Sequence, residues 1–155
     1  MGIGHPGLWF EEFEVGSVHR HSVTRTVTET DNVMFTCMTM NTQPLHLDAA
    51  YAADSEFGER IVNSLYTLAL LVGLTVADLT LRTTIANLGF ESVTFPKPVF
   101  HGDTIRAETH VIAVRPSASP PSAGIVSLEH VGLKQTGDVV AVARRSALVH
   151  RAPPT

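Results

Sequence analysis

The sequence predicts an α+β fold in which an antiparallel sheet is wrapped around one long buried helix. Residues 61–81 are the most apolar segment of the chain, and they are long enough to form that helix. After residue 82 the chain changes to four segments rich in Val, Ile, Thr and Phe, which are typical of strands. Helices followed by a run of strands indicate a helix packed on an antiparallel sheet.

Three elements are expected before the long helix. Residues 17–28 predict a strand, because valines alternate imperfectly with Thr and His. Thr30-Asp31 offers an N-cap for a short helix that reaches about Met40. Pro44 is expected to end that helix, since it disfavours the α conformation of the residue before it. Residues 48–56 then predict a second short helix.

The long helix is expected to run from Ser64 to Leu79, with Asn63 or Ser64 as its cap. Its apolar residues invite a membrane-spanning interpretation. Polar residues interrupt the segment, however, and no basic flank of the usual kind accompanies it. A helix that is apolar nearly all round is better interpreted as buried in a protein core.

The strands are expected over residues 83–95, 104–114, 124–134 and 139–149. Proline- and glycine-containing turns separate them, and Thr136-Gly137-Asp138 predicts a short hairpin. No internal repeat or linker is visible. The sequence therefore predicts a single domain over residues 1–155, with its core at about 10–150.

Composition excludes several classes of function. The net charge of -4 and the scarcity of Lys and Arg argue against a nucleic-acid partner. Cys37 is the only cysteine, so no internal disulfide is possible, and nothing nearby would lower its pKa for nucleophilic chemistry. The eight histidines lack zinc-ligand spacing, so no metal is expected. The absence of a signal-peptide pattern predicts a cytoplasmic protein without a membrane anchor.

The densest group of polar residues lies at residues 40–48. His46 follows a proline and precedes a predicted helix, where it has the side chain of a general base. Asn41 and Gln43 supply amides that can orient a carbonyl or a water molecule. The N–H groups at the start of the long helix can polarise a carbonyl oxygen. Asp48 is expected to cap the second helix, although it could also assist His46.

Four blocks of the sequence resemble the MaoC-like hydratases of the hot-dog fold, over roughly residues 10–149. They are residues 31–35, 41–48, 57–64 and 95–104, in the family's order and spacing. The resemblance implies a homodimer that binds an acyl-CoA thioester at its interface. It also implies reversible addition of water to a 2-enoyl-CoA, with no cofactor beyond the CoA carried by the substrate. The closest likeness is to the mesaconyl-CoA hydratase (β-methylmalyl-CoA dehydratase) branch.

The family's Asp-x-Asn-Pro-x-His pattern falls on residues 41–46, and the resemblance implies that Asn41 and His46 are the catalytic pair. Pro44 and His46 match the pattern, whereas Asn41 and Gln43 replace its Asp and Asn. An amide takes up no proton at neutral pH, so His46 would act alone as base and acid. Substrate binding is carried over to Gln43, Asn63 and Ser64, with the Ser64 N–H directed at the thioester oxygen.

The sequence therefore predicts a hydro-lyase, on a branched or dicarboxylic acyl-CoA such as mesaconyl-CoA. Two alternatives stay open. Loss of the family's Asp also suits a non-catalytic acyl-CoA-binding or regulatory protein. A thioesterase would need a carboxylate on the central helix, and residues 61–75 contain none.

Overall fold

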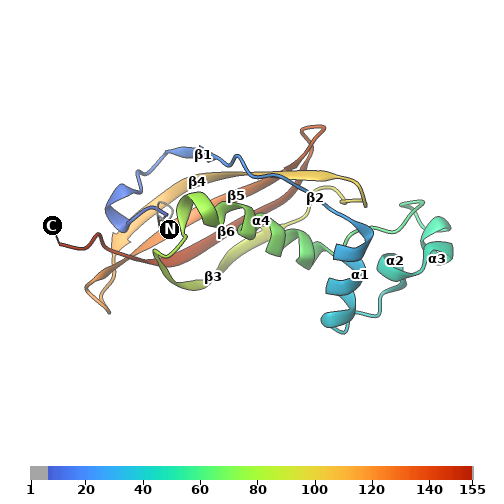
Figure 1. Cartoon of the computed structure of the whole chain (residues 1–155), viewed down its shortest axis with the longest axis horizontal. Helices are drawn as coiled ribbons and strands as arrows, with labels where there is room; N and C mark the ends of the chain where they lie inside the picture. Colours follow the sequence, from blue (N-terminus) through green and yellow to red (C-terminus); the bar gives the residue numbers. More distant parts are fainter. Residues whose placement is uncertain (1–6, 155) are drawn as a thin grey trace, which may run out of the picture.

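A computed structural model describes residues 7–154, and in it one antiparallel sheet lies along the long helix α4 (Figure 1). The helices α1 to α3 lie together beyond the N-terminal end of α4, at the right of the figure. The predicted α+β architecture is confirmed. In chain order the elements are η1 (Phe10–Glu12), β1 (Val18–Arg20), β2 (Arg25–Thr26), α1 (Glu29–Met38), α2 (Pro44–Leu47), α3 (Ala49–Ala53), α4 (Ser64–Leu79), β3 (Thr84–Thr94), β4 (Thr104–Pro116), β5 (Ala123–Lys134) and β6 (Val139–His150).

The sheet has the strand order β1-β4-β5-β6-β3, and β2 also pairs with β4. Every pairing is antiparallel. The four C-terminal strands are confirmed, and each begins and ends within two residues of its predicted bounds. Gly137 turns the chain between β5 and β6 with a φ of 88°, which explains why glycine occupies the tip of this hairpin. Strand β3 forms one end of the sheet, so one of its edges has no strand partner within residues 7–154.

Helix α4 begins at Ser64 and ends at Leu79, as the sequence predicts. The cap is Asn63, whose side-chain oxygen accepts a hydrogen bond from the N–H of Leu65 at 3.0 Å. Leu71 and Leu74 pack into one apolar cluster with the strands, and Leu79 packs into a second. Within residues 7–154 no helix, α4 included, has the length and hydrophobicity needed to cross a membrane.

The strand predicted at residues 17–28 is wrong in its middle, where the chain forms β1 and β2 with a break between them. The N–H of buried His21 still donates to the carbonyl of Ala107 on β4 at 3.0 Å, so the break falls on the exposed residues 22–24. Helix α1 also begins earlier than predicted. Thr28 is its N-cap, and the backbone N–H and hydroxyl of Thr28 both donate to the Asp31 carboxylate.

The expectation that Pro44 ends the first helix is also wrong. Helix α1 ends at Met38, and Pro44 is the first residue of α2, where a missing N–H costs nothing. Gln43 is extended, as predicted. Asp48 accepts bonds from the N–H groups of Ala50 and Tyr51 at 2.9 and 3.0 Å, which confirms it as the cap of α3. Helix α3 is shorter than the predicted 48–56.

A chain of hydrogen bonds links four buried polar side chains to Asp78. Arg145 has only donors, so its Nε donates to Nε2 of His130 at 2.8 Å. His130 Nδ1 then donates to the Thr109 hydroxyl, which bonds to His21 Nε2, each at 2.8 Å. His21 Nδ1 lies 2.8 Å from the Asp78 carboxylate. Burial, followed by the charge of Arg145, lowers the pKa of His130 to about 3.

His130 should make the folded protein sensitive to mild acid. Its pKa in the fold, about 3, lies below the ordinary value of 6.5, so the unfolded chain binds more protons between these limits. Stability from this group is complete above pH 6.5 and falls by about 1.4 kcal/mol per pH unit below it. We expect urea unfolding at pH 6.5 and 4.5 to show this loss.

The matched control is His130→Gln, because an amide can accept from Arg145 and donate to Thr109 without titrating. The variant should lose about 2–3 kcal/mol less than the natural chain between the two pH values. Equal losses in the two proteins would contradict the assignment of this acid sensitivity to His130.

Candidate active site

His46 lies in α2 with its ring fixed by the backbone of a distant segment. Its Nδ1 is 2.9 Å from the carbonyl oxygen of Ile61, which can only accept. The Nδ1 therefore carries the proton, and Nε2 is the unprotonated nitrogen of the neutral ring. No residue in the described part of the chain bonds to that Nε2. The ring of His46 is thus held so that Nε2 is the atom that could accept a proton.

Asn41 is partly buried in the turn between α1 and α2. Its backbone N–H donates to Thr36, and its side-chain oxygen accepts from the N–H of Gln43 at 3.0 Å. The amide nitrogen of Asn41 has no partner within residues 7–154, so this side chain offers donors to a ligand. Gln43 is exposed beside it. A water molecule could accept a bond from Asn41, but Asn41 could not take its proton.

The start of α4 supplies a different kind of group. Ser64 is exposed, and its backbone N–H has no acceptor among the described residues, as expected in the first turn of a helix. Asn63 is buried, with 2% exposure. The Asn63 amide nitrogen donates to the Thr36 hydroxyl at 3.3 Å, and its oxygen caps the helix. The contacts of Asn63 thus position Ser64, and its predicted contact with substrate stays a prediction.

Asn32 organises this region, although it is not among the site residues that the sequence predicts. It is fully buried in α1. Its oxygen accepts from the N–H of Asn63 at 2.9 Å. Its amide nitrogen has three acceptors: the carbonyls of His46 and Ile61 at 3.3 Å each and His101 Nε2 at 3.0 Å. The available signal was the spacing of Asn32 and Thr36, which puts two polar residues on one face of α1.

His101 is held neutral beside this network. Burial, and then the charge of Arg60, lowers its pKa below the ordinary value. Since its Nε2 accepts from Asn32, the remaining ring nitrogen carries the proton. Arg60 itself forms an ion pair with Glu29. His101 therefore supports the site as a hydrogen-bond acceptor and not as a cation.

A pocket of about 300 Å³ opens beside the N-terminal end of α4. Its walls come from the segment after α3, the first turns of α4 and the β3–β4 connection. The lining residues are Phe57, Ile61, Val62, Ser64, Thr67, Phe95, Pro96, Lys97, Pro98, Val99 and Val140. Of the predicted site residues, Ser64 lines this pocket. The lining set given above does not include Asn41, Gln43, His46 or Asn63. Ile61 lines the pocket, and its carbonyl oxygen accepts the hydrogen bond from the His46 ring, so His46 lies one residue away from the pocket lining.

Within residues 7–154 no group of three or more His, Cys, Asp or Glu side chains is placed to hold a metal ion. Cys37 is exposed and not paired in a disulfide. The chemistry that the described residues offer is that of an imidazole base, amide donors and a helix N-terminus.

An antiparallel sheet wrapped around one long central helix defines the hot-dog class of domain, and this chain has that fold. A structure from Mycobacterium tuberculosis, described as having a double hot-dog fold, superposes with a TM-score of 0.85 at 21% identity. The match covers 96% of this chain and 46% of the other. The chain thus corresponds in length to about half of that double fold.

The chain belongs to the MaoC-like domain family, whose model, described as "MaoC like domain", matches residues 12–142. A MaoC-like dehydratase structure from Rhodospirillum rubrum is 31% identical, with a TM-score of 0.84, and the match covers 96% of this chain and all of that one. The mesaconyl-CoA hydratase of Cereibacter sphaeroides is 32% identical over 134 residues, which is 86% of this chain but 38% of the relative. The chain spans about two fifths of the length of the first curated relatives that it matches.

Proposed function

We propose that the protein is a hydro-lyase that adds water to, or removes it from, the acyl group of a CoA thioester. The observation that carries the proposal is the fixed ring of His46, whose Nδ1 donates to Ile61 and whose Nε2 is left as the basic atom. The family membership and the mesaconyl-CoA hydratase relative support the same reaction. CoA enters as part of the substrate, with no further cofactor.

In hydration, His46 Nε2 takes a proton from water as the water oxygen forms a bond to C3 of the enoyl group. The electron pair of the C2–C3 double bond moves toward the thioester, and negative charge develops on the thioester oxygen. The Ser64 N–H donates to that oxygen and stabilises the charge. The His46 imidazolium then returns a proton to C2, which completes the addition of water, and the reverse steps give dehydration.

Asn41 has a positioning role in this mechanism. Its oxygen already accepts a bond from the N–H of Gln43, whereas its amide nitrogen has no partner within residues 7–154 and can donate to the water. A donor holds the water by its oxygen and leaves a water proton directed at His46. Gln43, exposed beside Asn41, is proposed to contact the substrate.

The substrate class follows from the uncharged residue 41. A dicarboxylic acyl group, as in mesaconyl-CoA, brings its own carboxylate into the site. A second carboxylate from the protein would repel it, and Asn41 removes that repulsion. We therefore propose a branched or dicarboxylic acyl-CoA as the preferred substrate.

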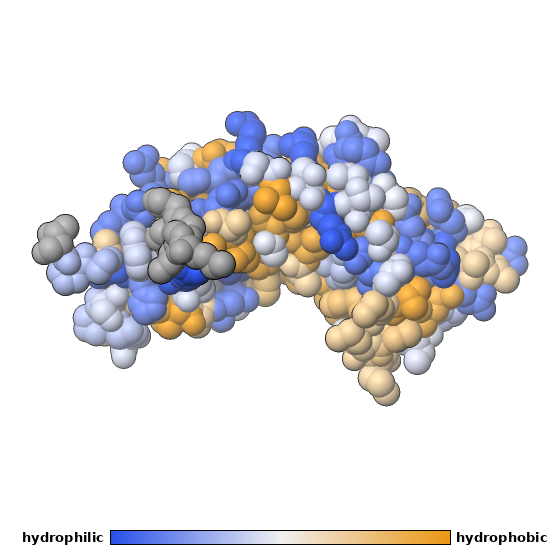
Figure 2. Space-filling model, in the orientation of Figure 1, coloured by the Kyte–Doolittle hydropathy of each residue, from blue (hydrophilic) through white to orange (hydrophobic). Residues whose placement is uncertain are grey.

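The proposed active form is a cytoplasmic homodimer. Figure 2 shows hydrophobic surface over α4 and over the lobe that contains α1, on either side of a hollow. Exposed apolar side chains also lie on β3, a strand at one end of the sheet. The exposed apolar residues of α1, α4 and β3 are Met34, Met38, Leu65, Ile85, Leu88 and Phe90. An unpaired strand edge beside exposed apolar side chains favours association with another chain. A monomer mass in sedimentation equilibrium at micromolar concentration would refute the dimer.

The function is tested by incubating the protein with crotonyl-CoA and mesaconyl-CoA while recording enoyl absorbance and free thiol. We expect the enoyl signal to fall without thiol release, and to fall faster for mesaconyl-CoA. Release of thiol would indicate a thioesterase instead. Tight binding without either change would indicate the non-catalytic acyl-CoA-binding protein, which the amide at Asn41 also suits. Equal rates for the two thioesters would contradict the substrate class alone.

A further inference from the structure

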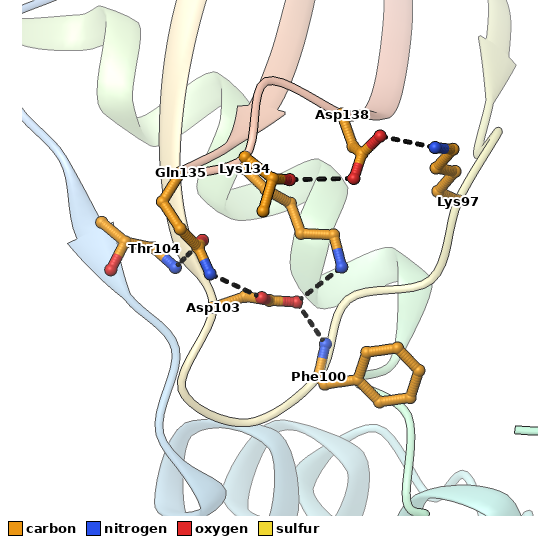
Figure 3. Close-up of polar contacts among 8 residues, drawn as sticks. Lys97, Phe100, Asp103, Thr104, Lys134, Gln135 and Asp138 are labelled. Carbon is orange, nitrogen blue, oxygen red and sulfur yellow. Dashed lines mark hydrogen bonds and ion pairs between the residues drawn. The ribbon is translucent and has the colours of Figure 1, made fainter. Parts of the chain in front are cut away.

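Two Lys–Asp pairs lie close together at the end of the sheet nearest α1, and Figure 3 shows both. The first pair is structural. Asp103 accepts from Lys134 Nζ at 2.9 Å, from Gln135 at 3.0 Å and from the Phe100 N–H at 2.9 Å. The Lys134 and Asp103 side chains are only 12% and 13% exposed. Their bonds tie the β5–β6 hairpin to the start of β4, and little of either charge faces solvent.

The second pair, Lys97 with Asp138, is more exposed than the first and has fewer hydrogen-bond partners. The side chains are 56% and 37% exposed. Lys97 lies between two prolines in the β3–β4 connection, and Asp138 is its one partner among the described residues. Asp138 also accepts from the Thr136 hydroxyl at 2.8 Å, so its carboxylate keeps a partner if Lys97 turns away. An exposed ion pair of this kind contributes little to stability.

Lys97, unlike Lys134, contributes to a pocket wall. It lines the pocket beside α4, together with Ser64, Ile61 and Thr67. The other lining residues within the described chain are uncharged. The pocket therefore carries a single positive charge on otherwise apolar and neutral walls, in a protein whose net charge is -4. An ammonium group in such surroundings favours an anionic ligand over a neutral one of the same shape.

We propose that Lys97 recognises an oxyanion of the bound thioester, and that Asp138 is the counter-ion it exchanges for that group. The proposal relies on the proposed function for the identity of the ligand as an acyl thioester. The oxyanion is either the free carboxylate of a dicarboxylic acyl group or a phosphate of CoA. Both offer the negatively charged oxygen acceptors that a lysine ammonium binds through charge-assisted hydrogen bonds.

Binding of saturated thioesters tests this proposal without catalysis. Calorimetry would compare butyryl-CoA with methylsuccinyl-CoA, whose acyl group ends in a carboxylate, and each with its pantetheine thioester, which lacks the nucleotide phosphates. Lys97→Met should raise Kd roughly tenfold for the ligands that carry the recognised oxyanion, the size expected of one charge-assisted hydrogen bond. Asp138→Asn should lower Kd for the same ligands, because it removes the competing carboxylate.

The set of thioesters that bind Lys97→Met more weakly than the natural protein identifies the oxyanion. Weaker binding of the methylsuccinyl thioesters alone assigns Lys97 to the acyl carboxylate, and weaker binding of the CoA thioesters alone assigns it to phosphate. Arg20→Met is the control, because it removes one positive charge from an exposed β1 side chain that pairs with Glu108 on β4. An equal effect of Lys97→Met on all four ligands, no effect on any, or the same effect in the Arg20 control would overturn the proposal.

The wild-type protein separates this inference from the proposed function. Binding of the saturated thioesters with no hydration of their enoyl counterparts would refute the hydro-lyase and leave the role of Lys97 to be decided by the variants. Failure of the wild-type protein to bind any of the four ligands would overturn both.

Discussion

Replacement of His46 by glutamine is expected to lower kcat for hydration by about 10²–10⁴, because no second acid or base replaces the imidazole. An amide retains a donor for the carbonyl of Ile61 but has no basic nitrogen. The carboxylate nearest in sequence, Asp48, is engaged as the cap of α3 by the N–H groups of Ala50 and Tyr51. Steady-state kinetics from the loss of enoyl absorbance measure the effect, and KM should change much less than kcat.

The control for this variant is His150→Gln, which makes the same change at an exposed position at the end of β6. It should leave kcat within about twofold of the natural protein, since surface substitutions have small effects. A His46→Gln protein that keeps its full kcat would remove His46 from the mechanism, and with it the observation on which the proposed function depends.

The variant Asn32→Asp is expected to destabilise the fold by about 3–5 kcal/mol at pH 8, although the two side chains have nearly the same shape. The new carboxylate is an acceptor only, so His46, Ile61 and His101 each lose the donor that faces them. It also places an unpaired charge at a position that is fully buried. Urea unfolding monitored by circular dichroism measures the loss.

Thr24→Asp is the control, because it introduces a carboxylate at an exposed position between β1 and β2, away from the proposed dimer surface. It should change stability by no more than about 0.5 kcal/mol. Burial raises the pKa of a carboxyl, so the cost of Asn32→Asp should shrink as the pH falls and the new group takes up a proton. Similar stabilities of the two variants at pH 8 would show that Asn32 does not hold the site together.

Local sequence patterns were sufficient for the second half of the fold. The strands after Arg82 carry β-branched residues between strong turn signals, and the apolar length of residues 64–79 specified α4 to its last residue. Before residue 48 the same reasoning located the strand region and the first helix but missed the break between β1 and β2 and the start of α2 at Pro44. There the chain is shaped by contacts between distant segments, such as the burial of His21 against Thr109 and Asp78. Such contacts leave little periodic signal in the sequence.

The site shows the same division. His46 was predicted from its setting and from the family resemblance, because its neighbours in sequence mark it. The partner that selects its tautomer, the carbonyl of Ile61, is a backbone atom fifteen residues away and has no sequence signature. Asn32 was missed for a related reason, since its four partners come from three other segments. Spacing along the chain locates chemical groups but not the atoms that orient them.

The three residues Ile61 to Asn63 have a consequence for how the site responds to motion. The carbonyl of Ile61 holds the base, and Asn63 leads directly into the N–H donor at Ser64. Asn32 grips this segment at both ends, through Ile61 and Asn63. The ring of His46, although carried by α2, is hydrogen-bonded to the same short segment that leads into the Ser64 donor. A displacement of residues 61–63 is therefore expected to move the ring and the donor in the same direction.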